Sequence, residues 1–268
     1  MAVWSVIVAA ARTRDRFAVT DWRGDGWRVW ILSCLGFTVL FVGLSVYMHA
    51  FAWSAGLDAT SPEFSVYWRS LLLIELVGVT VGTLAWWTWL VRSGRALPAT
   101  VAFDEEVRRI MVVWGLLGAT CVVLYFMASF FVSGDAAWHQ TAVRDTAFTP
   151  PHIVMFYCAF PLGITMTVGT YLYGVTRLPR VYSMNAGFPW SFFLLIGASV
   201  TEMLQVAVNE WGHSLWIAEE VFAAPLHWPF VIYVWLAAGT FAVWLETLIR
   251  VLSIEKQIAD QRTQAPQA

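Results

Sequence analysis

Long apolar runs separated by short polar stretches organise this chain. Six runs are long enough to cross a bilayer, which takes about 20 apolar residues in a helix. They lie at about 28–53, 65–91, 110–132, 152–175, 189–208 and 228–250. A segment inside lipid must satisfy its own backbone hydrogen bonds, so each run is predicted to be an α-helix. The pattern predicts an all-α integral membrane helical bundle with about six transmembrane helices.

Composition and charge support a membrane protein and orient it. The 268 residues are 59% hydrophobic and 13% charged, whereas soluble domains are about 25% charged. The net charge of −2 argues against a nucleic-acid partner. Fourteen of the sixteen Lys and Arg residues fall in alternate polar stretches, at 1–28, 92–109, 176–188 and 250–268. The positive-inside rule then places both termini in the cytoplasm.

This assignment divides the chain into three parts. Residues 1–27 form a cytoplasmic or interfacial N-terminal segment, 28–250 the transmembrane bundle, and 251–268 a cytoplasmic tail. Glu75 is the unusual residue within the bundle, because a carboxylate inside a membrane needs a partner. It could pair with another subunit or line a polar cavity.

Four of the five histidines border two outer loops, and the first loop carries three candidate metal ligands. Asp135 and His139 are four residues apart, so they share a face on a helical turn. His152 follows Pro150 and Pro151, which are typical of a helix N-terminus. The fifth histidine, His49, is better explained as a packing or interfacial residue.

The second loop, "NEWGHSLWIAEEVFAAPLHW", repeats this arrangement. Asn209 and His213 are again four residues apart, and His227 again opens the next apolar run after a proline. Imidazole binds copper or zinc well, and a carboxylate or amide oxygen can complete a three-ligand site with open positions. An ordinary hydrogen-bonded loop is the alternative. Because two trios with matched spacing are predicted on the same side of the membrane, metal binding is favoured over an ordinary loop. An amide carries no charge, so the Asn209 trio is predicted to hold metal more loosely.

At these residues the chain resembles a known family. The stretches "DAAWHQTAVRDTAFTPPH" and "NEWGHSLWIAEEVFAAPLHW", supported by "GLDATSPEFSVYW" and "TRLP", resemble the third, or C, subunit of the copper membrane monooxygenases over about residues 45–250. This family includes the particulate methane, ammonia and short-chain hydrocarbon monooxygenases.

The resemblance implies the site, the partners and the location. It implies copper sites at both trios, with zinc a substitute in isolated preparations: Asp135, His139, His152, Asn209, His213 and His227. It also implies A and B subunits as partners in a trimer of heterotrimers, contact with membrane lipid, and a bacterial cytoplasmic or intracytoplasmic membrane. The reaction would hydroxylate a small substrate with O2, and quinol is the possible electron donor.

The chain departs from the family at three places, which leaves the substrate open. They are "TEMLQVAV" at 201–208, Pro229 after "PLHW", and "SG" at 133–134. These changes favour a short-chain hydrocarbon over ammonia and methane. Two other functions remain alternatives: a non-catalytic metal-binding subunit of the same complex, and a haem- or quinone-binding membrane anchor. A haem site is disfavoured, because haem is bound by paired histidines deep on facing helices, whereas these four histidines lie at the outer edge.

Overall fold

The protein is a helical bundle in the computed structural model, which describes residues 25–97, 101–127, 131, 134–135, 138, 148–182, 187–201, 204 and 228–264. Within these ranges all regular structure is helical and there is no strand. The all-α prediction is therefore confirmed. The elements are α2 (Asp25–Ala55), α3 (Pro62–Phe64), η2 (Ser65–Arg69), α4 (Ser70–Arg95), α5 (Phe103–Phe126), α7 (Pro150–Val154), η4 (Met155–Ala159), α8 (Phe160–Arg177), α9 (Pro179–Tyr182) and α11 (Trp228–Gln264).

Five helices of the described chain are long and apolar enough to cross a membrane. They are Gly26–Ala55, Pro62–Arg95, Phe103–Phe126, Pro150–Arg177 and Trp235–Gln261. The remaining predicted span, 189–208, corresponds to a shorter apolar helix at Trp190–Thr201. Residues 202–203 and 205–208 lie outside the described part. A count of six spans and the cytoplasmic position of the termini stay predictions.

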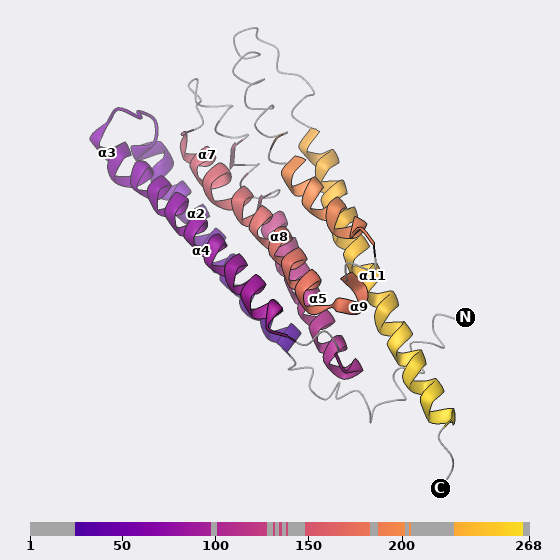
Figure 1. The fold of residues 1–268 in the computed structure, drawn as a ribbon. Helices are drawn as coiled ribbons and strands as arrows, with labels where there is room; N and C mark the ends of the chain where they lie inside the picture. The colour runs from indigo at the N-terminus through magenta and orange to yellow at the C-terminus, as the bar shows by residue number, and fades with distance from the viewer. Residues whose placement is uncertain are drawn as a thin grey trace.

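The helices lie side by side, with α5 and α8 in the middle (Figure 1). Helix α2 packs on α5, α4 packs on α8, and α5 and α8 pack on each other. Buried residues make up 67% of the most apolar part of the Pro150–Arg177 helix, but only 6% of that in Pro62–Arg95. Helix α4, like α2, therefore presents a broad apolar face that suits lipid or another subunit.

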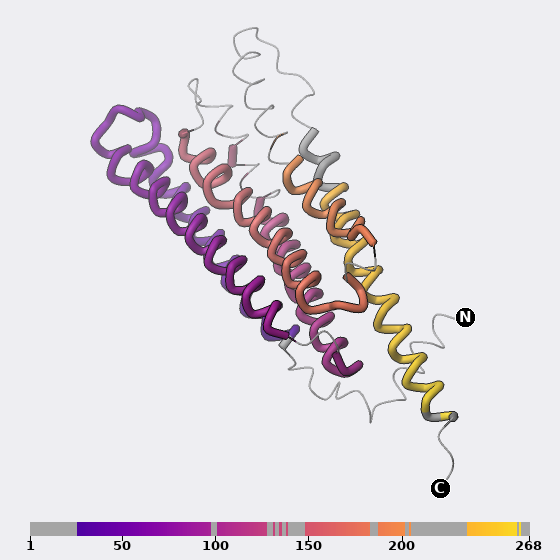
Figure 2. The backbone as a smooth tube through the Cα atoms, viewed as in Figure 1, coloured from indigo at the N-terminus to yellow at the C-terminus, as the bar shows by residue number. Residues whose placement is uncertain are grey.

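Helix α11 lies on the other side of the bundle, next to the helix at Trp190–Thr201 (Figure 2). The backbones come close at Gly239, where an added Cβ would lie 2.7 Å from the Cα of Leu195. Close approach of this kind is typical of small residues between membrane helices. The Trp114 indole of α5 also donates to Thr247 Oγ1 of α11 at 2.8 Å.

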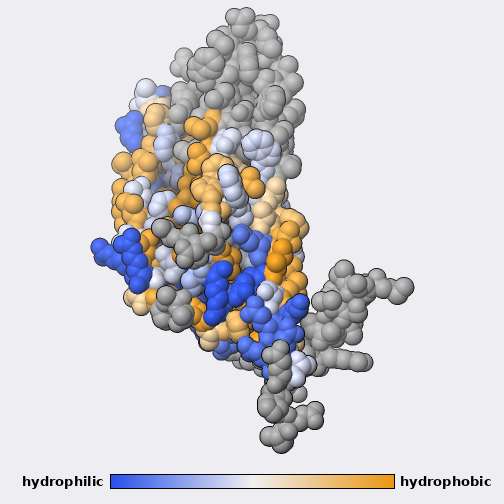
Figure 3. Space-filling view, turned by 45° about the vertical axis from the view of Figure 1, so that its right-hand side comes forward, coloured by the Kyte–Doolittle hydropathy of each residue, from blue (hydrophilic) through white to orange (hydrophobic). Residues whose placement is uncertain are grey.

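The two ends of the bundle differ in their charged residues. We call one the arginine end, where α4 and α8 finish and α5 begins; its cations include Arg92, Arg95, Arg108, Arg109, Arg177, Arg180 and Arg250. We call the other the histidine end, where α7 begins with His152. Figure 3 shows hydrophilic side chains gathered toward the lower part of one face, with many apolar side chains above them. Among the described arginines, Arg69 lies toward the histidine end.

Within the described chain, the π-helical turns η2 and η4 each form part of a long helix. The turn η4 directly precedes Phe160 and Pro161. A proline inside a helix has no N–H to donate and its ring crowds the preceding turn, which accounts for the change of hydrogen bonding. The turn η2 is closed by Ser70, whose hydroxyl donates to the carbonyl of Ser65 at 3.1 Å. Turns of this kind are frequent at functional sites, and η4 begins three residues after His152.

Candidate metal site at the histidine end

The side chains of Asp135 and His152 meet at the histidine end. Oδ1 of Asp135 lies 3.0 Å from Nε2 of His152. The Asp135 side chain is 9% exposed and that of His152 is 1% exposed, so the pair lies inside the protein. The structure thus brings together two of the three residues of the first trio.

The start of α7 fixes the position of His152. Pro150 and Pro151 occupy the first turn, where the missing N–H groups have no helical partner in any case. The imidazole then stacks on Phe156, with ring centroids 4.8 Å apart. On the other side, Gly56 lets the end of α2 approach closely, since a Cβ there would collide with the ring of Pro150. The imidazole is therefore held by its own helix, whose first turn packs on the end of α2 through Pro150.

Aromatic contacts with α2 hold the segment that carries Asp135. Before it, Phe131 packs edge-on against Phe41 with ring centroids 5.5 Å apart. After it, Trp138 stacks on Trp53 at 4.9 Å and is 3% exposed. Asp135 thus lies between two aromatic anchors, both of which pack on α2.

The spacing of the two side chains fits a shared metal ion. Metal–nitrogen and metal–oxygen bonds to these groups are about 2.0–2.2 Å, so neighbouring ligands near a right angle lie roughly 3 Å apart. The Asp135–His152 separation is 3.0 Å. A carboxylate and an imidazole are also donors that copper and zinc accept. The described pair therefore fits one side of such a site without rearrangement.

The other four predicted ligands, His139, Asn209, His213 and His227, lie outside the described residues. Within the described ranges, no group of three or more His, Cys, Asp and Glu side chains could hold a metal ion. Metal binding by both trios stays a prediction. His49 is exposed on α2, and its Nδ1 lies 2.7 Å from the carbonyl oxygen of Ser45.

Glu75 lies buried in α4, with 5% of its surface exposed. Neither carboxyl oxygen has a hydrogen-bond partner within the described structure. The sequence left open whether Glu75 pairs with another subunit or lines a polar cavity. Its burial within this chain disfavours the first alternative, and the second stays a prediction.

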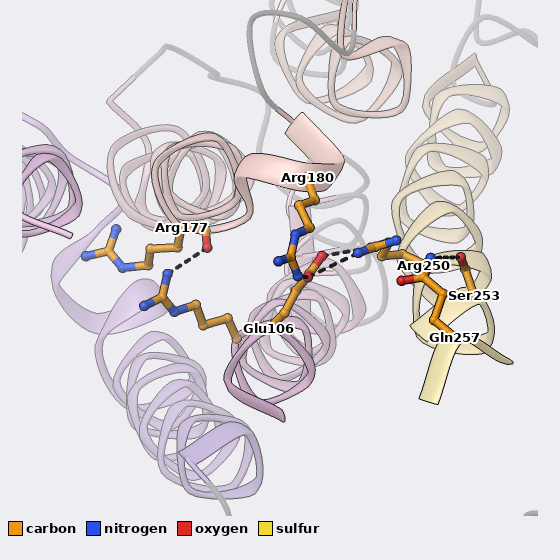
Figure 4. A network of polar contacts seen from close by, with 7 residues as sticks. Glu106, Arg177, Arg180, Arg250, Ser253 and Gln257 are labelled. Atoms are coloured by element: carbon orange, nitrogen blue, oxygen red, sulfur yellow. Dashed lines mark hydrogen bonds and ion pairs between the residues drawn. The ribbon is translucent and has the colours of Figure 1, made fainter. Parts of the chain in front are cut away.

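The arginine end holds a charge network that the sequence analysis missed. Glu106 of α5 is fully buried. It accepts hydrogen bonds from Arg180 of α9 at 2.7 Å and from Nε of Arg250 of α11 at 2.8 Å (Figure 4). One carboxylate thus joins three helices. Its partners lie 74 and 144 residues away along the chain.

A second part of this network joins α5 to α8 and α4. Arg109 donates from Nε to Glu105 Oε1 at 2.8 Å and from Nη1 to the carbonyl of Arg177 at 3.0 Å. Arg177 in turn donates to the carbonyl of Leu90 at 3.0 Å and to Ser93 Oγ at 2.6 Å. Close by on α9, burial raises the pKa of the Tyr182 hydroxyl, which is therefore neutral. Glu106 and Arg109 are in ion pairs, and Arg177 donates to neutral backbone and hydroxyl oxygens, so the protein itself supplies partners for each charge, as in a structural network.

Two apolar hollows open on the sides of the bundle. One, of about 630 Å³, lies between α5 and α11, and the other, of about 580 Å³, lies among α2, α4, α5 and α8. Asp135 and His152 line neither of them. The Asp135 and His152 side chains are themselves buried, at 9% and 1% exposed.

The described helices define the class of this protein. Five of them suit membrane crossing, so the chain is a multi-pass integral membrane protein. A sequence model of the family of ammonia monooxygenase/methane monooxygenase C subunits matches residues 11–257. The chain belongs to this family and is therefore one component of a membrane monooxygenase complex. This match confirms the resemblance based on the two histidine motifs. A comparison with curated proteins gives no match.

Proposed function

We propose that this chain supplies metal sites at the histidine end of a copper-dependent monooxygenase that hydroxylates a short-chain hydrocarbon, methane or ammonia. The reaction is X–H + O2 + two electrons + two protons, giving X–OH + H2O. The observation that carries the proposal is the buried Asp135–His152 pair, 3.0 Å apart, in a chain that matches the family over residues 11–257.

We assign the metal ligands to the two trios that the sequence presents. The first is Asp135, His139 and His152, and the second is Asn209, His213 and His227. Copper, when bound, supplies the redox chemistry that activates dioxygen. The Asp135 carboxylate contributes negative charge, and the contact with Phe156 keeps the His152 ring in one orientation. Burial of both side chains excludes bulk water from the reacting groups.

The proposal includes partners of this chain. A and B subunits, arranged as a trimer of heterotrimers, would complete the complex, and a quinol would supply the electrons. The broad apolar faces of α2 and α4 offer surface for a neighbouring subunit or for lipid. The apolar surroundings would also concentrate an apolar substrate near the site.

The test is substitution of both histidines of the second trio in the intact complex. His213→Ala and His227→Ala should each lower the copper content of the membranes and the rate of substrate oxygenation. Loss of copper with an unchanged rate would contradict a catalytic role and favour a structural metal site. Rates with ammonia, methane and butane, measured on the same membranes, would identify the substrate.

A haem- or quinone-binding anchor gives a different result. A haem Soret band that disappears on substitution of His152 or His213 would support that alternative. If active membranes show no Soret band, the haem-binding alternative is excluded.

A further inference from the structure

Glu75 is a buried acid that the metal trios do not use. It is 5% exposed, and its two oxygens have no hydrogen-bond partner in the described structure. An ionised, unpaired carboxylate in such surroundings costs several kcal/mol. The group is therefore a carboxylic acid in the resting protein. A buried polar group of this kind needs a functional explanation or an ordered water.

The position of Glu75 connects it with the helix that carries His152. Helix α4, which carries Glu75, packs against η4, whose Cys158 is 3% exposed. Cys158 follows His152 by six residues in one continuous helix, which corresponds to about 9 Å along the axis. Glu75 thus lies deeper in the bundle than the candidate metal site, on the neighbouring helix.

A second unsatisfied polar group lies between Glu75 and the histidine end. Trp68, seven residues before Glu75, is fully buried, and its indole N–H has no hydrogen-bond partner in the described structure. Seven residues are about two helical turns, so both side chains lie on one side of the same helix. Trp68 Nε1 is also near Gly56, which packs on Pro150, two residues before His152. The Trp68 indole N–H therefore lies on a route from the Glu75 carboxyl group toward the candidate metal site.

We propose that Glu75 is the proton donor that supplies the candidate metal site, through water molecules hydrogen-bonded along the Trp68 side of this helix. The inference rests on the proposed monooxygenase function, in which O2 is the oxidant and a two-electron donor the reductant. Each turnover consumes two protons. The O–H bond of the Glu75 carboxyl group breaks, its proton passes along the waters and ends in the product H2O. The carboxylate then takes up a proton from the aqueous phase.

The test compares Glu75→Gln with Glu63→Gln in the intact complex. Glutamine keeps the size and polarity of the side chain but cannot release a carboxyl proton. Glu63 lies on α3 in the same continuous helix and is exposed, so its variant is the matched control. We expect E75Q to keep wild-type copper content and KM and to lose at least about tenfold in kcat. E75D should restore part of the rate, and E63Q should behave as wild type.

The solvent deuterium isotope effect separates proton delivery from a structural role. It should rise in E75Q, because proton transfer then limits turnover, and stay unchanged in E63Q. Wild-type kcat and isotope effect in E75Q would overturn the inference and leave the copper assignment intact. Loss of copper in E75Q would also overturn it, because Glu75 would then act on the metal site itself.

Infrared spectroscopy of the wild-type complex keeps the inference testable if E75Q does not assemble. A buried protonated carboxyl group gives a C=O band that shifts in deuterated solvent, and the Glu75 band should move in E75D. Absence of such a band would overturn the inference. Full turnover of copper-free wild-type complex would instead defeat the proposed function.

Discussion

The two ends of the bundle treat buried carboxylates differently. At the arginine end, Glu106 is surrounded by two arginines from other helices, and its negative charge is neutralised by the protein itself. At the histidine end, Asp135 faces His152, whose charge depends on its protonation. The first arrangement is complete without a ligand. The second consists of donors that also suit a metal ion.

This contrast separates the buried carboxylate that stabilises the fold from the one that can bind a metal ion. A carboxylate with permanent cationic partners stabilises helix contacts and leaves little capacity to bind anything else. A carboxylate beside an imidazole keeps that capacity, because the imidazole is itself a metal ligand. Substitutions at the arginine end should therefore change stability, and substitutions at the histidine end should change metal content.

Removal of the Glu106 carboxylate should have the largest effect. Glu106→Ala leaves Arg180 and Arg250 without their shared partner. Their side chains are 39% and 17% exposed, so the loss should lie below that of a fully buried pair, about 3–5 kcal/mol, and above that of an exposed one, about 1 kcal/mol. The thermal unfolding temperature of the purified complex should fall sharply. Asp104→Ala is the control: its carboxylate lies in the first turn of α5 and is exposed, and exposed charges of this kind contribute about 1 kcal/mol or less. Equal destabilisation by the two variants would contradict the contrast.

Asp135→Asn should lower metal affinity more than stability. The amide keeps the shape of the side chain but loses the negative charge that favours a cation. Loss of groups that only orient a ligand costs about 10–100-fold in affinity, so loss of a ligand should exceed that. Copper per folded complex, measured by elemental analysis during titration with a chelator, gives the affinity. Asp104→Asn, exposed at the arginine end, should leave it unchanged.

Gly56→Ala should disturb the histidine end through packing. The added methyl group would collide with the ring of Pro150 and with the carbonyl of Ala52. Overpacking of this kind costs about 1–3 kcal/mol. Because Pro150 begins the helix of His152, copper affinity should fall together with stability. Gly43 lies within α2, the helix that Gly56 follows, with open space around it, so an equal loss in Gly43→Ala would show that the effect is not local.

Asn209→Asp should have the smallest effect, and it should be a gain. The substitution gives the second trio the carboxylate of the first, and charged ligands hold cations more strongly than amides do. Copper affinity of this site should rise by about tenfold, or 1.4 kcal/mol. Titration of copper-depleted complex would measure it. Wild-type occupancy of the Asn209 trio that equals that of the Asp135 trio would contradict the premise.

Hydrophobic pattern predicts the spans of this protein better than their ends. The run at 110–132 corresponds to α5, which in fact begins at Phe103 and includes Glu106. Hydropathy alone could not predict that the helix includes Glu106. Its carboxylate is neutralised by Arg180 and Arg250. These partners come from distant segments, and no local signal pairs them.

The candidate site was predictable in part for a local reason. The charge pattern predicted that Asp135 and His152 lie on one side of the membrane, and their spacing and the prolines suggested a shared site; the structure brings the two side chains together. The contacts that hold them, such as Trp53 with Trp138 and Gly56 with Pro150, depend on how α2 packs. Spacing along the sequence carries no information about that packing.

The measurement that tests the central claim most directly is copper per folded complex in His152→Phe, beside Glu106→Ala. Phenylalanine keeps an aromatic ring against Phe156 but has no nitrogen to bind metal. We expect H152F to lose the copper of this site, with a matching change in its electron paramagnetic resonance signal, while remaining folded. E106A should unfold more easily and keep wild-type copper in its folded fraction. Wild-type copper content and signal in H152F would contradict the account.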